Sequence, residues 1–526
     1  MKKPIIGIVF LAMSFSSFAF GPGDSLANKY AATITAKDLT KHLTIIASDE
    51  FEGRETGKPG QKKAAEYIKA QFINSGLEPG NKGNYFQEYP LITQDPKGVE
   101  ITVNGKKYEF LKDFYYFPGF GDTLMNINEI TFLGYGISDK KYDDYTGFDA
   151  KGKALVVLSG EPKAKNKKSF ITGNKKVSDW SINHRMKGRI AAEKGVSAMF
   201  VVVDDLKANL KTVKFFIENP TMRLDNNQSA SSSRIPVFYI NKEMAGSLLQ
   251  SSETEDKILK YEQEISKKGK PKRVSFESKT TLSILRESEK LTSENVLGFV
   301  EGTDLKDEIL VVTSHYDHLG TDGEKIYNGA DDDGSGTVSV MEIAEAFAKA
   351  KAEGNGPRRS ILFMTVSGEE KGLFGSQYYV ENPVYPLENT IANLNIDMVG
   401  RVDKKYKDNP NYLYLIGSDK LSTELHKISE NANSGYTNLT LDYTYNRPND
   451  PNRFYYRSDH YNFAKNNIPV IFYFNGSHED YHKATDTVDK INFSVLEKRA
   501  KLVFYTAWEL ANRDERLQVD VESDFK

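Results

Sequence analysis

Three short clusters of histidine and acidic residues carry the side chains best suited to metal chemistry in this sequence. They are His315-Tyr316-Asp317-His318, the triplet 331–333 within Gly-Ala-Asp-Asp-Asp-Gly-Ser-Gly, and Glu369-Glu370. Imidazole and carboxylate groups are the ligands that zinc and similar divalent ions take in proteins. The clusters therefore offer both the ligands of a metal site and a spare carboxylate that can act as a base.

The residue types suggest a task for each cluster. His315 can bind an ion through one ring nitrogen, and Asp317, on the same side of an extended chain, can hold the other. One aspartate of the triplet can bridge two ions, and one residue of the glutamate pair can bind while the other stays free. A single cluster of this kind is typical of a turn or a solvated loop, so the prediction of a site depends on all three occurring together.

The flanking segments indicate how these clusters are positioned. Residues 309–313 and 361–366 are short, continuous apolar runs, which is typical of buried strands. Residues 337–350 have apolar side chains at helical spacing, so the aspartate-rich loop leads into a helix. Open α/β sheets place their active sites at strand ends beside helix starts, and we expect the clusters to meet at such an edge.

The ordered motifs resemble peptidase family M28, the co-catalytic dizinc aminopeptidases, over nearly all of the chain after its first residues. The resemblance implies an α/β fold with a mixed, mostly parallel sheet flanked by helices, of the zinc aminopeptidase and phosphorylase/hydrolase-like type. The segments that carry it are His315-x-Asp317, Gly-Ala-Asp331-Asp332-Asp333-Gly-Ser-Gly, Glu369-Glu370, Asn395-Ile396-Asp397-Met398 and Asp480-Tyr481-His482-Lys483.

The same resemblance implies two Zn²⁺ ions per chain, with cobalt or manganese as possible replacements. One ion would take His315, Asp332 and Asp397, and the other would take Asp332, Glu370 and His482. Asp332 is chosen as the bridge because the family's bridging aspartate stands two positions before the small-Ser-Gly segment. The other two aspartates of the triplet are then expected to shape the loop.

The catalytic roles also follow from the resemblance. Glu369 is expected to act as the general base towards a water activated by the two ions, and Asp317 to orient His315. Tyr481 is expected to donate a hydrogen bond to the developing oxyanion, with a buried packing role as the alternative. No residue identifies itself as the partner of a substrate's free α-ammonium group.

These expectations favour an exported metallo-aminopeptidase that removes N-terminal residues from peptides. One alternative is a glutaminyl cyclase-like enzyme, which works with a single zinc. Another is an M28 carboxypeptidase, which requires an arginine patch for a substrate carboxylate; only Arg453 and Arg457 are noted for this role. A third is a binding protein that has lost catalysis, which the complete ligand set disfavours.

The composition limits the partners. The chain has 526 residues, which predicts two or three domains, and a net charge of −3 with 27% charged residues argues against a nucleic-acid surface. The absence of cysteine excludes disulfides and cysteine-bound metal. Peptides are the expected partners, and the oligomeric state stays open.

The first residues have the pattern of a signal peptide. Lys2 and Lys3 precede an apolar run at 5–13, and Ser17-Phe18-Ala19 supplies small residues for cleavage after Ala19. No other stretch approaches the ~20 apolar residues of a spanning helix, so we expect no stable membrane association. The predicted protein is exported, either periplasmic or secreted.

The middle of the chain has a different pattern of apolar runs and motifs, and it is predicted to be an inserted domain. Short strand-like runs begin near residue 130, none of the metal-type clusters occurs there, and Tyr142-Asp143-Asp144-Tyr145 resembles part of a protease-associated (PA) domain. We therefore expect a smaller, β-rich α/β PA-like domain at 128–261, inserted into a catalytic domain of residues 20–127 and 262–526. The Asp143-Asp144 pair is interpreted as a solvated turn in preference to a calcium site.

Several local expectations can be compared directly with a structure. Thr35 is predicted to cap a helix, and Ser494 with Glu497 to form the capping box of the closing helix. The charged segment 253–273 is predicted to be a solvated linker. Arg54 is expected to be a structural residue at the surface, and His460 to have a structural role.

Overall fold

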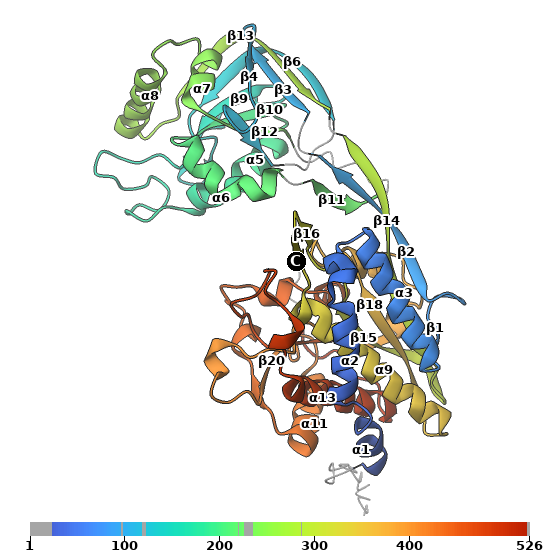
Figure 1. Ribbon diagram of the computed structural model, residues 1–526. Helices are drawn as coiled ribbons and strands as arrows, with labels where there is room; N and C mark the ends of the chain where they lie inside the picture. The colour runs from blue at the N-terminus through green and yellow to red at the C-terminus, as the bar shows by residue number, and fades with distance from the viewer. Residues whose placement is uncertain are drawn as a thin grey trace, which may run out of the picture. The chain divides into compact units, whose positions relative to one another are not determined.

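A computed structural model describes residues 24–95, 98–117, 122–218, 220–225, 235–285 and 287–522. The chain divides into two compact units: a first unit of residues 1–89 and 292–526, and a second unit of residues 90–291 (Figure 1). The predicted signal peptide, residues 1–19, lies outside the described residues. Within the described ranges, no helix is both long and apolar enough to cross a membrane.

The first unit is built on a mixed sheet, as predicted, although parallel pairings do not outnumber antiparallel ones among the described pairs. Its four central strands run parallel to one another in the order β18-β15-β19-β22, and β14 and β20 pair antiparallel to the outer two of these. The sheet order and bounds are β11 (Thr221–Leu224), β2 (Phe86–Gln94), β14 (Ser288–Val300), β18 (Arg359–Val366), β15 (Leu305–His315), β19 (Thr390–Ile396), β22 (Val470–Phe474), β20 (Tyr412–Ile416) and β21 (Thr440–Asp442), and β1 (Glu78–Pro79) pairs with β14.

Helices cover both faces of this sheet, which explains why the strand segments are continuously apolar. In β15, Leu310 and Val312 pack into the core on one face, whereas Ile309 and Val311 pack into the core on the other. The first face is covered by α1 (Ser25–Ala31), α2 (Ala36–Ile46), α3 (Pro59–Asn74), α9 (Gly336–Ala352), α11 (Thr423–Ala432) and α13 (Phe493–Asn512) (Figure 1). The second is covered by α10 (Phe374–Glu381) and α12 (His460–Ala464).

The second unit has its own sheet and its own core. The strand order is β4 (Lys106–Tyr108), β3 (Val99–Val103), β13 (Arg273–Ile284), β6 (Thr123–Leu133), β9 (Ala154–Leu158), β10 (Ala198–Val202), β12 (Val237–Ile240) and β5 (Phe114–Tyr116). The helices of this unit are α4 (Asp179–Ile182), α5 (His184–Glu193), α6 (Leu206–Glu218), α7 (Lys242–Leu248) and α8 (Thr254–Lys268).

The second unit extends beyond the predicted boundaries, residues 128 and 261, on both sides. The strand β13 pairs with β3 on one side and with β6 on the other, so segments near residues 100 and 280 belong to this sheet. These pairings join residues far apart in the sequence, and no local pattern marks them. The compact unit at 90–291 thus includes strands on both sides of the predicted PA-like domain at 128–261.

The charged segment at 253–273 corrects another expectation, because most of it is the helix α8. Ile258, Tyr261 and Ile265 are buried at helical spacing, and the helix ends at Gly269 in the left-handed conformation with φ 59°. Lys267 and Lys268 occupy the last turn of this helix, where positive charge is favourable.

The helix caps divide into one confirmed and one corrected expectation. Thr35 caps α2, with its side chain accepting a hydrogen bond from the Asp38 amide. The closing helix α13 is capped by Asn492, whose side chain accepts from the Val495 amide, so the predicted box at Ser494 lies inside the helix. Asparagine and serine are similarly favourable as N-cap residues, so the residue at which the preceding loop joins the helix decides which of them is the cap.

Asp144 also differs from the expectation of a solvated turn. Its carboxylate is buried and accepts hydrogen bonds from the amides of Tyr135 and Ile137 and from the hydroxyl of Tyr142. Burial raises the pKa of Asp144 to about 6, and these hydrogen bonds oppose the shift. Asp144 therefore organises a turn inside the second unit.

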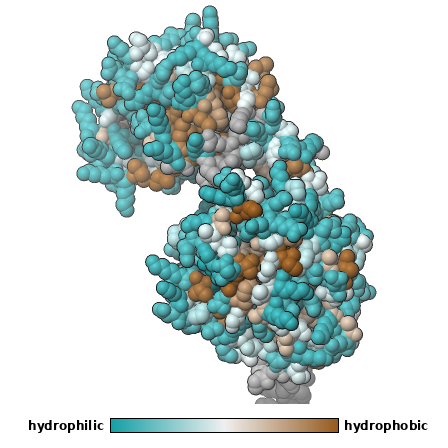
Figure 2. Space-filling view, in the orientation of Figure 1, coloured by the Kyte–Doolittle hydropathy of each residue, from teal (hydrophilic) through white to brown (hydrophobic). Residues whose placement is uncertain are grey.

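On the visible face of each unit, apolar residues form separate patches within a largely hydrophilic surface (Figure 2).

Candidate metal centre

The predicted site residues gather at the carboxyl ends of the four central parallel strands. His315 is the last residue of β15, Asp397 directly follows β19, and Glu369 and Glu370 follow β18 by a few residues. Asp332 lies in the loop between β15 and α9, and His482 lies in the loop after β22. This is the edge at which open α/β sheets position their active sites.

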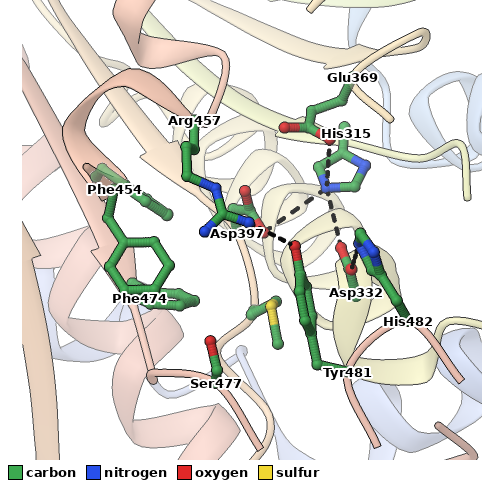
Figure 3. Close-up of a pocket in the computed structure, with 12 residues that line it drawn as sticks. His315, Asp332, Glu369, Asp397, Phe454, Arg457, Phe474, Ser477, Tyr481 and His482 are labelled. Atoms are coloured by element: carbon green, nitrogen blue, oxygen red, sulfur yellow. Dashed lines mark hydrogen bonds and ion pairs between the residues drawn. The ribbon is translucent and has the colours of Figure 1, made fainter. Parts of the chain in front are cut away.

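Asp332 lies between two histidines that are far apart in the sequence. Its Oδ1 is 3.3 Å from Nε2 of His315, and its Oδ2 is 3.2 Å from Nε2 of His482 (Figure 3). Asp397 Oδ1 is 3.7 Å from the same His315 nitrogen, and Glu370 Oε2 is 3.3 Å from the same His482 nitrogen. The five side chains thus form two groups of ligand atoms that share one carboxylate.

Two of these carboxylate oxygens are buried without a hydrogen bond, although each has a histidine nitrogen nearby. Asp332 Oδ2 and Glu370 Oε1 have no hydrogen-bond partner within the part of the chain that the structure describes. An unpaired buried carboxylate oxygen is costly unless a cation compensates it. The donor set and these unpaired oxygens fit divalent ions such as zinc.

The pKa shifts show the same demand for positive charge. Burial opposes charging of His482, but Asp332 and Glu370 outweigh it and raise the pKa of His482 to about 10. Burial likewise acts against ionisation of Asp332, yet contacts with His315 and His482 hold its pKa well below the usual range. The carboxylates therefore favour cationic neighbours, which two bound ions would supply.

Glu369 lies beside these groups and lines the cavity (Figure 3). Its Oε2 is 4.0 Å from Nε2 of His315, farther than the oxygens of Asp332 and Asp397. Burial raises the pKa of Glu369 well above its ordinary value; the charges of Glu370 and Asp397 add to this and His315 opposes it. Glu369 is thus placed as a carboxylate with an increased affinity for a proton.

Asp317 lies behind His315, although the carboxylate is not the closest partner of the ring. The Asp317 main-chain carbonyl oxygen is 3.1 Å from His315 Nδ1, whereas its carboxylate oxygen is 3.7 Å away. The carboxylate instead accepts hydrogen bonds from the Thr56 hydroxyl at 2.6 Å and from the Glu369 amide at 3.2 Å. Asp317 therefore links the loops that carry His315 and Glu369.

Tyr481 also lines the cavity, next to His482. Its ring stacks on that of His482 with centroids 3.8 Å apart, and its oxygen accepts a hydrogen bond of 3.1 Å from Arg457 Nη2 (Figure 3). Burial raises the pKa of Tyr481 above its ordinary value, so the phenol stays protonated. The remaining wall is mainly apolar and consists of Met398, Phe454, Phe472, Phe474 and Ser477.

Arg54 is buried, which corrects the expectation of a surface position. Its guanidinium donates hydrogen bonds to the main-chain carbonyls of Ile46, Tyr316, Asn328 and Gly329. The planar fork of donors suits several carbonyls at once, and this explains how a charged residue is accommodated there. Arg54 is structural, as expected, and holds the loops on either side of the metal ligands.

His460 is fully buried, and its ring stacks on Phe472 with centroids 4.8 Å apart. Burial lowers its pKa to about 3, so the ring is neutral. This environment agrees with the structural role expected from the sequence.

His318 is the residue near the site to which the sequence analysis assigned no role. It is fully buried, and its Nδ1 is 2.7 Å from Glu370 Oε1 and 3.9 Å from Asp332 Oδ2. Ligand atoms of His318, Asp332 and Glu370 lie within 4.8 Å of one another. Its position three residues after His315 was the available signal, but spacing alone does not show which way the ring points.

The comparisons with known proteins identify a family for part of the chain. Residues 295–507 match the family model described as Peptidase family M28. The chain is similar to a "Probable zinc metalloprotease" of Pyrenophora tritici-repentis, with 39% identity over 117 residues, or 21% of this chain and 22% of that protein. It is also similar to Aminopeptidase YwaD of Bacillus subtilis, with 26% identity over 235 residues, or 43% and 46% of the two chains. The matched segments span less than half the length of these relatives.

Among solved structures, the chain resembles the aminopeptidase from Aneurinibacillus sp. strain AM-1. The TM-score is 0.54 at 20% identity, and the match covers 94% of this chain and 99% of that one. This likeness shows that the two chains share a fold.

Proposed function

Since residues 295–507 belong to peptidase family M28, we propose that the protein is an exported aminopeptidase that uses two zinc ions to hydrolyse the first peptide bond of its substrates. The observation that carries the proposal is Asp332, whose two oxygens face His315 and His482 at 3.3 and 3.2 Å. A carboxylate between two imidazoles can hold two cations close together.

The donor groups divide between the ions. His315, Asp332 and Asp397 would hold one ion, and Asp332, Glu370 and His482 would hold the other. Bound zinc would lower the pKa of a water molecule from ~15.7 towards ~7 and polarise the substrate carbonyl. The contacts of Asp332 with His315 and His482 keep both imidazoles directed towards the proposed ions.

Glu369 is the proposed general base. Its carboxylate lies 4.0 Å from His315 Nε2 and outside the proposed ligand set, a position that suits a group accepting the water's proton and later releasing it to the leaving amine. The Glu369 amide donates to Asp317, and this hydrogen bond fixes the loop that carries the base.

Tyr481 is the proposed donor to the oxyanion. Because its oxygen already accepts from Arg457, its own proton is free to point into the cavity. A fixed neutral donor near the scissile carbonyl stabilises the charge that develops on it. The nearby apolar wall, with Phe454 and Phe474, supports a substrate whose first side chain is apolar.

A carboxypeptidase is the second candidate, and Arg457 is the observation that favours it. This guanidinium lines the cavity and can bind a substrate carboxylate. The glutaminyl cyclase alternative requires one zinc, whereas the donor set offers two groups of ligands. Metal stoichiometry therefore separates the cyclase from both peptidases.

The remaining parts of the proposal concern export and the second unit. We propose that residues 1–19 are a signal peptide and that residues 128–261, within the compact unit at 90–291, form a PA-like domain, on the motifs given above. N-terminal sequencing of protein collected outside the cytoplasm tests the first point: a mature chain starting near residue 20 is expected, and an intact Met1 contradicts it.

The central experiment measures metal content and substrate choice on the pure protein. Two zinc ions per chain are expected, with release of free amino acids from amino-acid anilides and peptides but not from N-acetylated controls. Release from the carboxyl end of N-blocked peptides would favour the carboxypeptidase. A pure, folded protein with neither metal nor peptidase activity would overturn the proposal.

A further inference from the structure

His318 lies beside the predicted metal ligands but is not one of them. Its side chain is fully buried, and neither ring nitrogen has a hydrogen-bond partner among the residues described. Its Nδ1 is 2.7 Å from Glu370 Oε1, but the approach does not have the direction of a hydrogen bond. A buried imidazole without hydrogen-bond partners is costly, and His318, unlike His460, lies beside two carboxylates of the candidate site.

The surroundings hold the ring in this position. The His318 amide donates to the Arg54 carbonyl, which fixes the main chain. On one side of the ring lies Gly329 with φ 53°, where an added Cβ would come within 2.5 Å of ring atoms Cγ and Cδ2. The glycine therefore allows a close approach that any other residue would obstruct.

The distances around His318 are compatible with shared coordination. Ligand atoms bound to a tetrahedral zinc at about 2.0–2.2 Å lie roughly 3.3 Å from one another. His482 Nε2 is 3.2 Å from Asp332 Oδ2 and 3.3 Å from Glu370 Oε2. His318 Nδ1 approaches the same two side chains, at 2.7 Å from the other Glu370 oxygen, Oε1, and at 3.9 Å from Asp332 Oδ2. The His318, Asp332 and Glu370 ligand atoms lie within 4.8 Å of one another.

We propose that His318 is a fourth protein ligand of the ion held by Asp332, Glu370 and His482. This inference rests on the proposed function, which requires ions at this centre. Four protein ligands close a tetrahedral zinc site, whereas three leave a position for water or substrate. The two ions would then differ in their number of protein ligands: four would hold the ion at His318, and three would hold the ion at His315 and Asp397.

X-ray absorption at the zinc edge on the wild-type holoenzyme tests the ligand count without a mutation. Three imidazoles shared by two ions are expected: His315, His318 and His482. Two imidazoles shared by two ions would overturn the role of His318 and leave the peptidase proposal standing. A protein that binds no zinc at all would instead refute the proposed function.

Zinc titration against a competing chelator tests the same inference through affinity. Loss of an outer hydrogen-bond partner costs roughly 10–100-fold in metal affinity, so loss of a ligand should cost more than this. The tighter site should weaken beyond that range in both His318→Ala and His318→Gln, because an amide is a poor zinc ligand. His460→Phe, which removes another buried histidine, is the matched control and should leave both sites unchanged.

The glutamine variant distinguishes a ligand from a hydrogen-bond donor. An amide can still donate to Glu370, so retention of wild-type affinity in His318→Gln would show that His318 only positions Glu370. Circular dichroism of each variant establishes that it is folded. If both variants fail to fold, the wild-type absorption spectrum still decides the ligand count.

Discussion

The role proposed for Glu369 depends on its carboxylate remaining free of the proposed ions. Its carboxylate lies 4.0 Å from the His315 ring nitrogen, and its burial favours a proton over a charge. A ligand and a base make different demands on the same side chain, because a ligand shares its lone pairs with the ion throughout the reaction. A substitution that removes the negative charge of Glu369 and keeps the shape of its side chain tests this distinction.

Glu369→Gln is expected to keep both zinc ions and to lose about 10²–10⁴ in kcat, the usual contribution of a general base. Steady-state kinetics and metal analysis on the same preparation check this. The exposed Glu381→Gln is the control and should match the wild type. Loss of an ion in Glu369→Gln would mean that Glu369 is a ligand.

Tyr481→Phe removes one hydroxyl from the cavity wall. The loss of a single oxyanion donor should lower kcat by about 10²–10³ with little change in KM. The comparison is Tyr456→Phe, an exposed tyrosine outside the cavity lining. An unchanged kcat for Tyr481→Phe would support the alternative, in which Tyr481 only packs against His482.

His460 should make stability depend on pH. The pKa of His460 is about 3 in the folded protein and about 6.5 in the unfolded chain. Between these values the unfolded chain takes up a proton that the folded protein does not, so the free energy of unfolding falls as the pH is lowered from 6.5 towards 3. Within that window the wild type should lose about 1.4 kcal/mol per pH unit relative to His460→Phe. Urea unfolding of metal-free proteins at several pH values measures the difference, and parallel profiles would contradict the assignment.

At the scale of elements, the site depends on loops that different elements bring together. Arg54 lies just before α3, yet its guanidinium reaches carbonyls at the end of α2, after β15 and before α9. Since those loops carry His315, His318 and Asp332 or their neighbours, the arginine fixes the frame in which the ligands converge. A neutral residue there would leave several buried carbonyls unpaired.

Arg54→Met is therefore expected to destabilise the first unit by about 3–5 kcal/mol. Arg54→Lys should recover only part of this, because an ammonium group cannot reproduce the planar fork. Urea unfolding of the metal-free chain measures both, with the partly exposed Arg516→Met as control. Equal stability of Arg54→Met and wild type would show that the carbonyls find other partners.

At the scale of the whole molecule, the two units have separate sheets and separate hydrophobic cores. All the candidate ligands lie in the first unit. Bound ions stabilise only the part of the chain that holds them, by an amount set by concentration and affinity. The units should therefore respond differently to chelation.

Removal of metal by a chelator is expected to abolish activity and to lower the stability of the first unit by about 2.7 kcal/mol or more if zinc is present at 100 times its dissociation constant. Hydrogen exchange read by mass spectrometry locates the effect. Protection should fall in segments of residues 24–89 and 292–522 and stay constant in 90–291, with recovery on adding zinc. Equal loss of protection in both units would contradict independent folding.

Local sequence already determined much of the architecture of this protein. The strands that end at the clusters and the helix after the aspartate triplet follow from side-chain type and short-range spacing. The choice of ligand residues follows from the resemblance to family M28. Only the tertiary structure decided three features: the burial of Arg54, the extent of the second unit and the approach of His318 to Glu370. Each depends on contacts between residues far apart in the chain, and such contacts leave no periodic trace in the sequence.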